Sequence, residues 1–133
     1  MSALSDFRAD IVARVGALTG HKECPGGDPA QIPDHWTSGF VVDLPEWTVD
    51  GDRSAKVCRG PLLVALWYRT DQLSFEQGAW MSAWEALCDQ LEATAWDAGK
   101  DSATIVVVGA ETDRTDDRFV GRLLAEWTLT YSR

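Results

Sequence analysis

The sequence predicts an α+β protein in which an N-terminal helix and one long central helix pack on a small sheet of mixed or antiparallel strands. Apolar residues recur every three or four positions near the N-terminus and again in the middle of the chain, which is the pattern of amphipathic helices. Continuous apolar runs and one alternating segment supply the strands. With 133 residues, the chain has the length of one domain, which we expect to span residues 1–133.

The first helix is expected to begin at a capping serine, Ser2 or Ser5, and to run to about Ala17, with Gly20 ending it. Its apolar face consists of Leu4, Phe7, Ile11, Val15 and Leu18. Residues 21–38 follow, and their prolines and adjacent glycines predict a loop of unusual length for a compact domain.

The central helix is expected between Ser74 and Gly99. Ser74 and Gln77 have the spacing of a capping box, and Gly99 suits a helix C-terminus. The apolar stripe of this helix consists of Trp80, Trp84, Leu87, Leu91 and Ala95, widened by Met81 and Cys88. A stripe this broad requires a sheet to cover it.

Five segments have the composition of strands. They are 39–49, 54–58, 62–68, 103–108 and 123–131. Pro45 interrupts the first and marks it as an edge strand, and Gly60–Pro61 is expected to separate the second from the third. In the last segment, Ala125, Trp127, Leu129 and Tyr131 alternate with polar residues.

Two features of these strands predict surfaces. Residues 62–68 are apolar on both sides of the pleat, so the sheet face away from the helices needs its own cover, for example a neighbouring subunit. Residues 109–118 are densely charged and predict a projecting, solvated hairpin between the last two strands.

The charge balance excludes some classes of function. Twelve Lys and Arg against 21 Asp and Glu give a net charge of −9, which disfavours nucleic-acid binding. No apolar run reaches about 18 residues, so no membrane span is expected. The N-terminal segment lacks the pattern of a signal peptide, and the three cysteines have no framework spacing, so a cytoplasmic protein with reduced thiols is expected.

Several residues are candidates for chemical sites. His21, Cys24, His35 and Cys58 are the residue types that bind zinc, but their spacing lacks paired ligands at both ends. His21 and Cys24 lie in a Pro/Gly loop without the rigid supports of a nucleophile and its base. The aspartates of residues 109–118 lack the pattern of a calcium loop, and no phosphate-binding glycine motif occurs. We therefore expect no enzyme, no metal site and no cofactor.

Two tryptophans are the first candidates for a contact with another subunit or partner. Trp36 and Trp47 lie beside prolines and acidic residues in irregular segments, where large aromatic side chains are hard to bury locally. The other candidate contact residues belong to the charged hairpin, and they are Asp113, Arg114, Asp116, Asp117 and Arg118.

The order of segments also resembles a known family. An amphipathic helix, a Pro/Gly loop, strands, the apolar run 61–68, one long helix and a charged hairpin leading into Ala-Glu-Trp-Thr-Leu-Thr-Tyr at 125–131 follow one another. Over most of the chain, this layout resembles the tail terminator or tail completion proteins of long-tailed phages and tail-like particles.

The resemblance implies a structural virion protein. Its subunits form a ring, commonly a hexamer, that caps the head-proximal end of the tail tube, stops tube polymerisation and provides a surface for head–tail joining. The implied partners are further copies of the chain, the tail tube protein and a head connector or neck protein. The implied location is the host cytoplasm during assembly and then the neck of the virion.

Three other interpretations stay open. The long loop 21–38 departs from the family layout and favours another neck or head-completion protein with the same ring habit. An acidic monomeric interaction module, such as a toxin-immunity protein, is a second interpretation, since its charge would mask a basic partner. A small enzyme that uses the region of His21 and Cys24 is the third.

Overall fold

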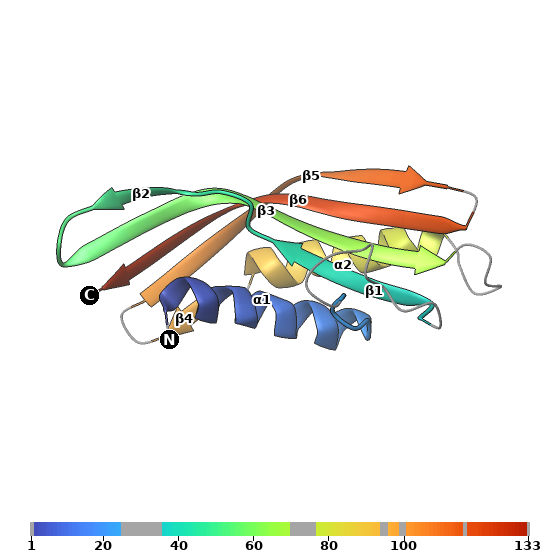
Figure 1. Cartoon of the computed structure of the whole chain (residues 1–133), viewed down its shortest axis with the longest axis horizontal. Coiled ribbons are helices and arrows are strands. Elements are labelled where there is room, and N and C mark those ends of the chain that lie inside the picture. The colour runs from blue at the N-terminus through green and yellow to red at the C-terminus, as the bar shows by residue number, and fades with distance from the viewer. Residues whose placement is uncertain are drawn as a thin grey trace.

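The computed structural model describes residues 2–24, 36–69, 77–93, 96–98, 101–115 and 117–132. The elements in chain order are α1 (Ala3–Thr19), β1 (Ser38–Asp43), β2 (Thr48–Gly51), β3 (Ala55–Arg69), α2 (Gln77–Ala93), β4 (Trp96–Ala98), β5 (Asp101–Arg114) and β6 (Arg118–Ser132). Both helices pack on one face of a single antiparallel sheet (Figure 1). The predicted α+β class is confirmed.

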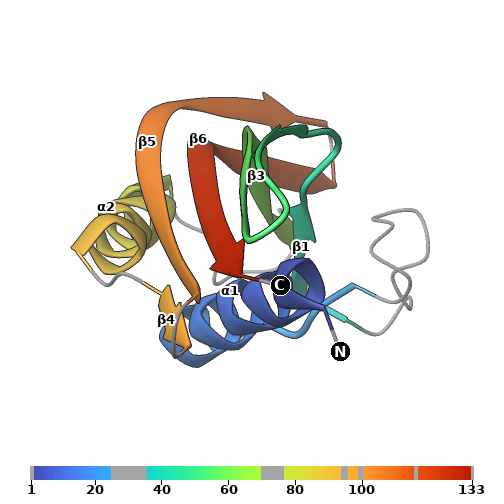
Figure 2. The same cartoon turned by 90° about the vertical axis from the view of Figure 1, so that its left-hand side faces the viewer.

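The strand order in the sheet is β1-β3-β6-β5-β4, and β2 pairs with the first part of β3. The 15-residue strands β3 and β6 are paired along their whole lengths and form the centre of the sheet. The register between β5 and β6 shifts between Val107 and Gly109. At this bulge β5 bends sharply, as Figure 2 shows, so the sheet curves.

Helix α1 has the predicted caps. The Ser2 side chain accepts a hydrogen bond from the Ser5 amide, and Gly20, at φ 72°, donates its amide to the Gly16 carbonyl oxygen. Three residues of the predicted apolar face, Phe7, Ile11 and Val15, are buried, whereas Leu18 at the last turn is exposed. The approximate length of this helix and most of its buried face were therefore predictable from the sequence.

The core lies between the helices and the sheet. On β6 the predicted alternation is confirmed, because Ala125, Trp127 and Leu129 are buried. The Trp127 indole donates a hydrogen bond of 2.9 Å to the carbonyl oxygen of Pro61, so its polar atom is satisfied inside the core. The helix side of the core is formed by Phe7, Ile11, Val15, Trp80, Leu87 and Leu91.

The expected break at Gly60–Pro61 is wrong, because β3 runs through it. At this point β3 has β6 on one side and a gap between β1 and β2 on the other, so the missing amide of Pro61 costs no ladder bond there. The chain between β1 and β2 crosses over Gly60 so closely that a Cβ atom would lie 2.2 Å from the Glu46 carbonyl oxygen. The dipeptide marks a crossing of two segments and not a turn.

The predicted extent of the central helix is also wrong at its C-terminal end. Helix α2 ends at Ala93, and residues 96–98 form β4, which pairs with the start of β5. Met81, expected to widen the buried stripe, is 55% exposed, whereas Trp80, Leu87, Cys88 and Leu91 are buried. Ser74, Ala95 and Gly99 lie outside the described residues.

The loop and hairpin predictions are partly confirmed. Residues 25–35 of the expected loop lie outside the described residues, but Glu23 forms a bridge beside Phe40 of β1. The segment 109–118 does connect two antiparallel strands. Most of it is strand, because β5 continues to Arg114 and β6 begins at Arg118.

Candidate functional site

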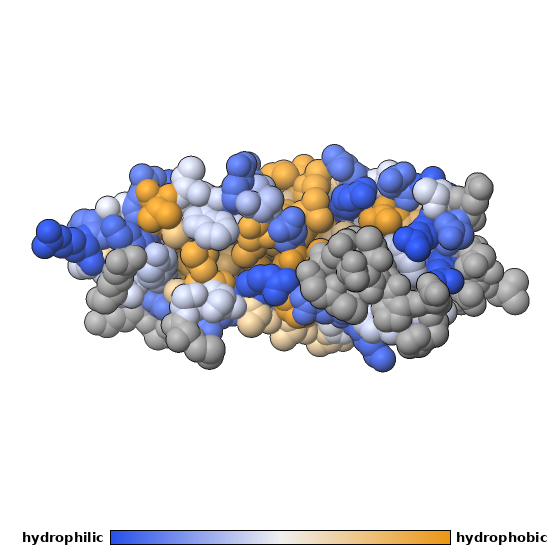
Figure 3. Space-filling model, in the orientation of Figure 1, coloured by the Kyte–Doolittle hydropathy of each residue, from blue (hydrophilic) through white to orange (hydrophobic). Residues whose placement is uncertain are grey.

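The face of the sheet opposite the helices, here called the open face, is the most distinctive surface of the molecule. A small apolar cluster lies on it, with Cys24, Val41 and Ala65 buried and Leu63 and Val120 partly buried around them. Figure 3 shows apolar side chains reaching the surface in the middle of the molecule, where β3, β5 and β6 cross in the view of Figure 1. Within the described residues, no helix covers this side of the sheet.

Two valines of β5 are among the most exposed of the large apolar side chains that the structure describes. Val106 is 55% exposed and Val108 is 60% exposed, on either side of Val107 at the bulge. Such residues on a strand usually pack against another layer. Their exposure makes this part of β5 a candidate contact surface.

Three arginines gather on the open face toward the hairpin end, and we call them the arginine cluster: Arg69, Arg118 and Arg122. Arg69 and Arg118 lie directly opposite each other on β3 and β6. Their guanidinium groups lie over the ring of Trp67, at 5.9 and 5.5 Å from its centroid. Like charges opposite each other destabilise a sheet, and the aromatic ring offsets part of that cost.

Within the described residues, the arginine cluster has two carboxylates beside it on β5. They are Glu111 and Asp113, and Asp113 faces Val120 between Arg118 and Arg122. The ion pairs found among the described residues join other arginines to carboxylates, namely Arg8, Arg14 and Arg59. Glu111 of β5 faces Arg122 in the ladder, but no ion pair within 4.0 Å forms between them. The cluster therefore presents donors that an acidic partner would satisfy.

The outward side of α2 carries the opposite charge. Glu85, Asp89 and Glu92 are exposed along it, and we call them the acidic stripe. No Lys or Arg occurs between residues 77 and 93. After burial itself, Glu92, Asp89 and Glu85 help to raise the pKa of the neighbouring Cys88 thiol. Glu92 Oε2 also accepts a hydrogen bond of 3.3 Å from the Val107 amide.

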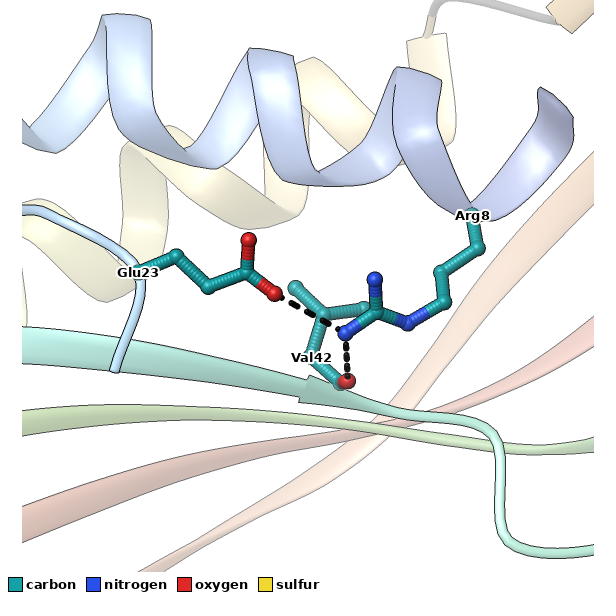
Figure 4. Close-up of polar contacts among 3 residues, drawn as sticks. All are labelled: Arg8, Glu23 and Val42. Carbon is teal, nitrogen blue, oxygen red and sulfur yellow. Dashed lines mark hydrogen bonds and ion pairs between the residues drawn. The ribbon is translucent and has the colours of Figure 1, made fainter. Parts of the chain in front are cut away.

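The outer edge of β1 is closed by the chain itself. Phe40 exchanges backbone hydrogen bonds with Lys22 and Cys24, of 3.0 and 2.8 Å. Next to them, Arg8 Nη2 of α1 donates to Glu23 Oε1 at 3.0 Å and to the Val42 carbonyl oxygen at 3.2 Å (Figure 4). This edge therefore has few groups left for another strand to pair with.

The two predicted contact tryptophans do not form one patch. Trp36 is half-buried beside the end of the sheet where Ser38 pairs with Tyr68, and the Lys22 ammonium lies 5.6 Å from its ring centroid. Trp47 is 45% exposed and packs on Trp127, with ring centroids 6.3 Å apart. Ser38 near Trp36 pairs with Tyr68, and Thr48 next to Trp47 pairs with Arg59. These two positions are nine residues apart along β3, or about 30 Å at the usual rise per residue.

The predicted hairpin residues lie near Trp36 and not near Trp47, because β5 ends and β6 begins at the same end of the sheet as the start of β1. Asp113, Arg114, Asp117 and Arg118 are exposed, and Asp116 lies outside the described residues. The Thr115 amide donates to the Arg118 carbonyl oxygen and closes the turn. Of the predicted candidates, only Arg118 belongs to the arginine cluster.

Sequence reasoning did not identify Arg69, Arg122 or the acidic stripe. Arg69 ends the apolar run of β3, and nothing in its neighbourhood in sequence places it opposite Arg118. That juxtaposition depends on the register of β3 with β6. The stripe could have been found, since Glu85 and Asp89 have helical spacing and no cation lies nearby in sequence.

Of the possible zinc ligands, His21, Cys24 and Cys58 are not brought together, and His35 lies outside the described residues. The possible nucleophile pair is not brought together either. The His21 ring packs edge-on against Tyr68 at 4.9 Å, on the helix side of the sheet, whereas Cys24 packs with Val41 on the open face. Burial lowers the pKa of His21, and a backbone hydrogen bond at Gly39 partly opposes that shift. Among the described residues, no three His, Cys, Asp or Glu side chains are grouped as a metal site would require.

Neither described helix is both long and apolar enough to cross a lipid bilayer. No protein-family model matches the chain, and no curated protein sequence matches it. The open face, the arginine cluster and the acidic stripe are therefore the features of this chain that point to a function.

Proposed function

We propose that this protein is the subunit of a closed homo-oligomeric ring, of the kind that tail terminator proteins form at the head-proximal end of a phage tail tube. The observation that carries the proposal is the sheet with described helices on one face only, which exposes Val106 on the open face and Val108 at the adjacent bulge. A second copy of the chain is the simplest cover for that face. The order of helices and strands agrees with the family layout that the sequence resembles.

In this role the ring stops growth of the tail tube and offers a surface for joining the head. Trp36 and the hairpin tip around Asp117 lie at one end of the sheet, and we assign the contact with the tube protein or the head connector to this end. The net charge of −9 suits a ring through which DNA passes, because it repels phosphate groups.

The proposal is tested by the native mass of the protein over a wide range of concentrations, measured by light scattering after size exclusion, with negative-stain images of any heavy peak. A closed ring of about six subunits is expected. A strict monomer at every concentration, also unable to bind isolated tail tubes, would refute it. That result would favour the acidic, immunity-like module.

A second experiment with the purified protein distinguishes a tail terminator from the related head-completion protein. A tail terminator ring binds the end of isolated tail tubes and blocks their further growth. A head-completion ring binds the head connector and leaves tube growth unchanged. Tube length after addition of purified protein, measured by electron microscopy, separates the two.

A further inference from the structure

We propose that the acidic stripe of α2 in one subunit docks on the arginine cluster of the open face in the next subunit. This inference rests on the proposed ring and names the two surfaces that meet within it. It commits to one occupant of the open face, a second copy of this chain. Four observations support it. The sheet and helix α2 each carry an unfavourable arrangement of charges, the two surfaces fit each other in size, and their pairing gives a heterologous interface.

The sheet carries a charge arrangement that is unfavourable in the isolated subunit. Arg69 and Arg118 are cross-strand neighbours of like charge, held over Trp67. Within the described residues, Trp67 Nε1 and Arg69 Nε are buried and have no hydrogen-bond partner. Departures from favourable local pairing are expected where a second surface compensates them.

Helix α2 carries the complementary problem. Glu85 and Asp89 are one turn apart, and like charges at this spacing destabilise a helix. Asp89 also lies near the C-terminal end of α2, where the helix dipole disfavours negative charge, and no basic residue occurs in the last turn. Glu92 has a partner in the Val107 amide, but that bond does not neutralise the other two carboxylates.

The two surfaces fit each other in size and composition. Glu85 and Asp89 are separated by about 6 Å along the helix axis, and neighbouring strands that carry Arg69 and Arg118 are about 5 Å apart. One turn before Glu85, Met81 is 55% exposed and adds an apolar side chain to the same side of the helix. A helix laid on the open face would cover a sheet that is otherwise covered on one side only.

The contact joins two different surfaces of the chain, so each subunit uses one surface toward each neighbour. Such a heterologous interface closes into a ring when the rotation between subunits allows it. A nucleic acid is a poorer occupant of the arginine cluster because the whole chain carries a charge of −9. Strand addition at β1 is disfavoured because Lys22, Cys24 and Arg8 already occupy that edge.

A charge exchange tests the pairing. One variant carries Glu85→Lys and Asp89→Lys, and a second carries Arg118→Glu and Arg122→Glu. Each variant alone is expected to need about ten-fold or more higher concentration than the wild type to assemble, because like charges then face each other across the contact. An equimolar mixture of the two variants is expected to regain assembly, since each reversed surface meets a complementary one.

Matched controls separate charge from folding. Glu46→Lys and Arg53→Glu make charge changes of the same kind at exposed positions outside both surfaces, and they should assemble like the wild type. The α2 variant places lysines near the helix C-terminus, so its thermal midpoint as a monomer should not fall. A variant that folds normally and does not assemble therefore indicates that the contact between the acidic stripe and the arginine cluster has been lost.

The outcomes distinguish this inference from the proposed function. Wild-type assembly, failure of each variant and recovery in the mixture support the pairing. Wild-type assembly with unchanged variants, or with no recovery on mixing, overturns the pairing and leaves the ring in place. A wild-type protein that forms no ring, alone or on isolated tail tubes, overturns both.

Discussion

At the scale of single residues, Gly121 determines how closely α2 can approach the sheet. A Cβ atom built on Gly121 would lie 2.5 Å from three ring atoms of Trp80. Trp80 is 3% exposed, so its ring has no free space into which it could move. The Trp80 indole can therefore pack against β6 at this position only because Gly121 has no side chain.

We predict that Gly121→Ala lowers the free energy of unfolding by about 1 to 3 kcal/mol, the usual cost of overpacking a core. Chemical denaturation of the monomer measures it. The matched control is Gly78→Ala at the exposed start of α2, where nothing lies within 4 Å of the new Cβ atom. That variant should gain up to about 1 kcal/mol from helix propensity. Equal effects of the two variants would contradict the contact.

The buried residues show what sequence spacing can and cannot identify. Spacing identified Phe7, Trp80 and Trp127 as core residues, and all three are buried. It could not identify the need for glycine at position 121, because that need arises from Trp80, 41 positions earlier in the chain. Contacts between residues distant in sequence are set by strand register, which local periodicity does not encode.

At the scale of elements, Arg8 fastens α1 to the closed edge of the sheet. Its guanidinium joins the Glu23 carboxylate and the Val42 carbonyl oxygen, which belong to two different segments. The side chains of Arg8 and Glu23 are 39% and 36% exposed, so the ion pair itself contributes little. The same Nη2 atom also donates to the Val42 carbonyl oxygen, and a hydrogen bond from a charged group to a neutral acceptor contributes more than a half-exposed ion pair.

We predict that Arg8→Met destabilises the protein by about 1 kcal/mol and speeds hydrogen exchange at the amides of Phe40 and Cys24, which pair along this edge. Hydrogen exchange followed by NMR measures both sites. Glu23→Gln is the control, because it removes the charge pair and leaves the bond to Val42 possible. It should change exchange less, and a larger effect than that of Arg8→Met would refute the assigned role of Val42.

The errors in the predicted elements have identifiable physical causes. Gly60–Pro61 resembles a turn in sequence, but here it permits a crossing segment to pass over an unpaired stretch of β3. Residues 96–98 are too few to show strand alternation, and only their pairing with β5 makes them a strand. The helices and the alternating strand β6 were predictable because their patterns repeat several times within one segment.

At the scale of the whole molecule, the candidate site was predictable only in part. The need for a cover on the second sheet face followed from the apolar run in β3, and the structure leaves that face without a helix. Trp36 and Trp47, the two contact tryptophans that the sequence predicts, lie far apart on different parts of the surface. Exposure of apolar side chains depends on the folded sheet, so composition alone could not select Val106 and Val108.

The open face should be required for assembly and dispensable for folding of the subunit. We predict that the double variant Val106→Glu with Val108→Glu remains monomeric at concentrations where the wild type forms rings. Its free energy of unfolding should change by about 1 kcal/mol or less, because both side chains are more than half exposed. Light scattering and chemical denaturation of the same samples measure the two effects.

Val49→Glu provides the comparison that locates the contact. Val49 is 52% exposed on β2, at the opposite end of β3 from the arginine cluster, so this variant should still assemble. If Val49→Glu blocked rings while the β5 double variant formed them, the subunit contact would lie at β2, where Trp47 is the nearest exposed aromatic side chain. The exposed valines of β5 would then need an occupant other than a second subunit.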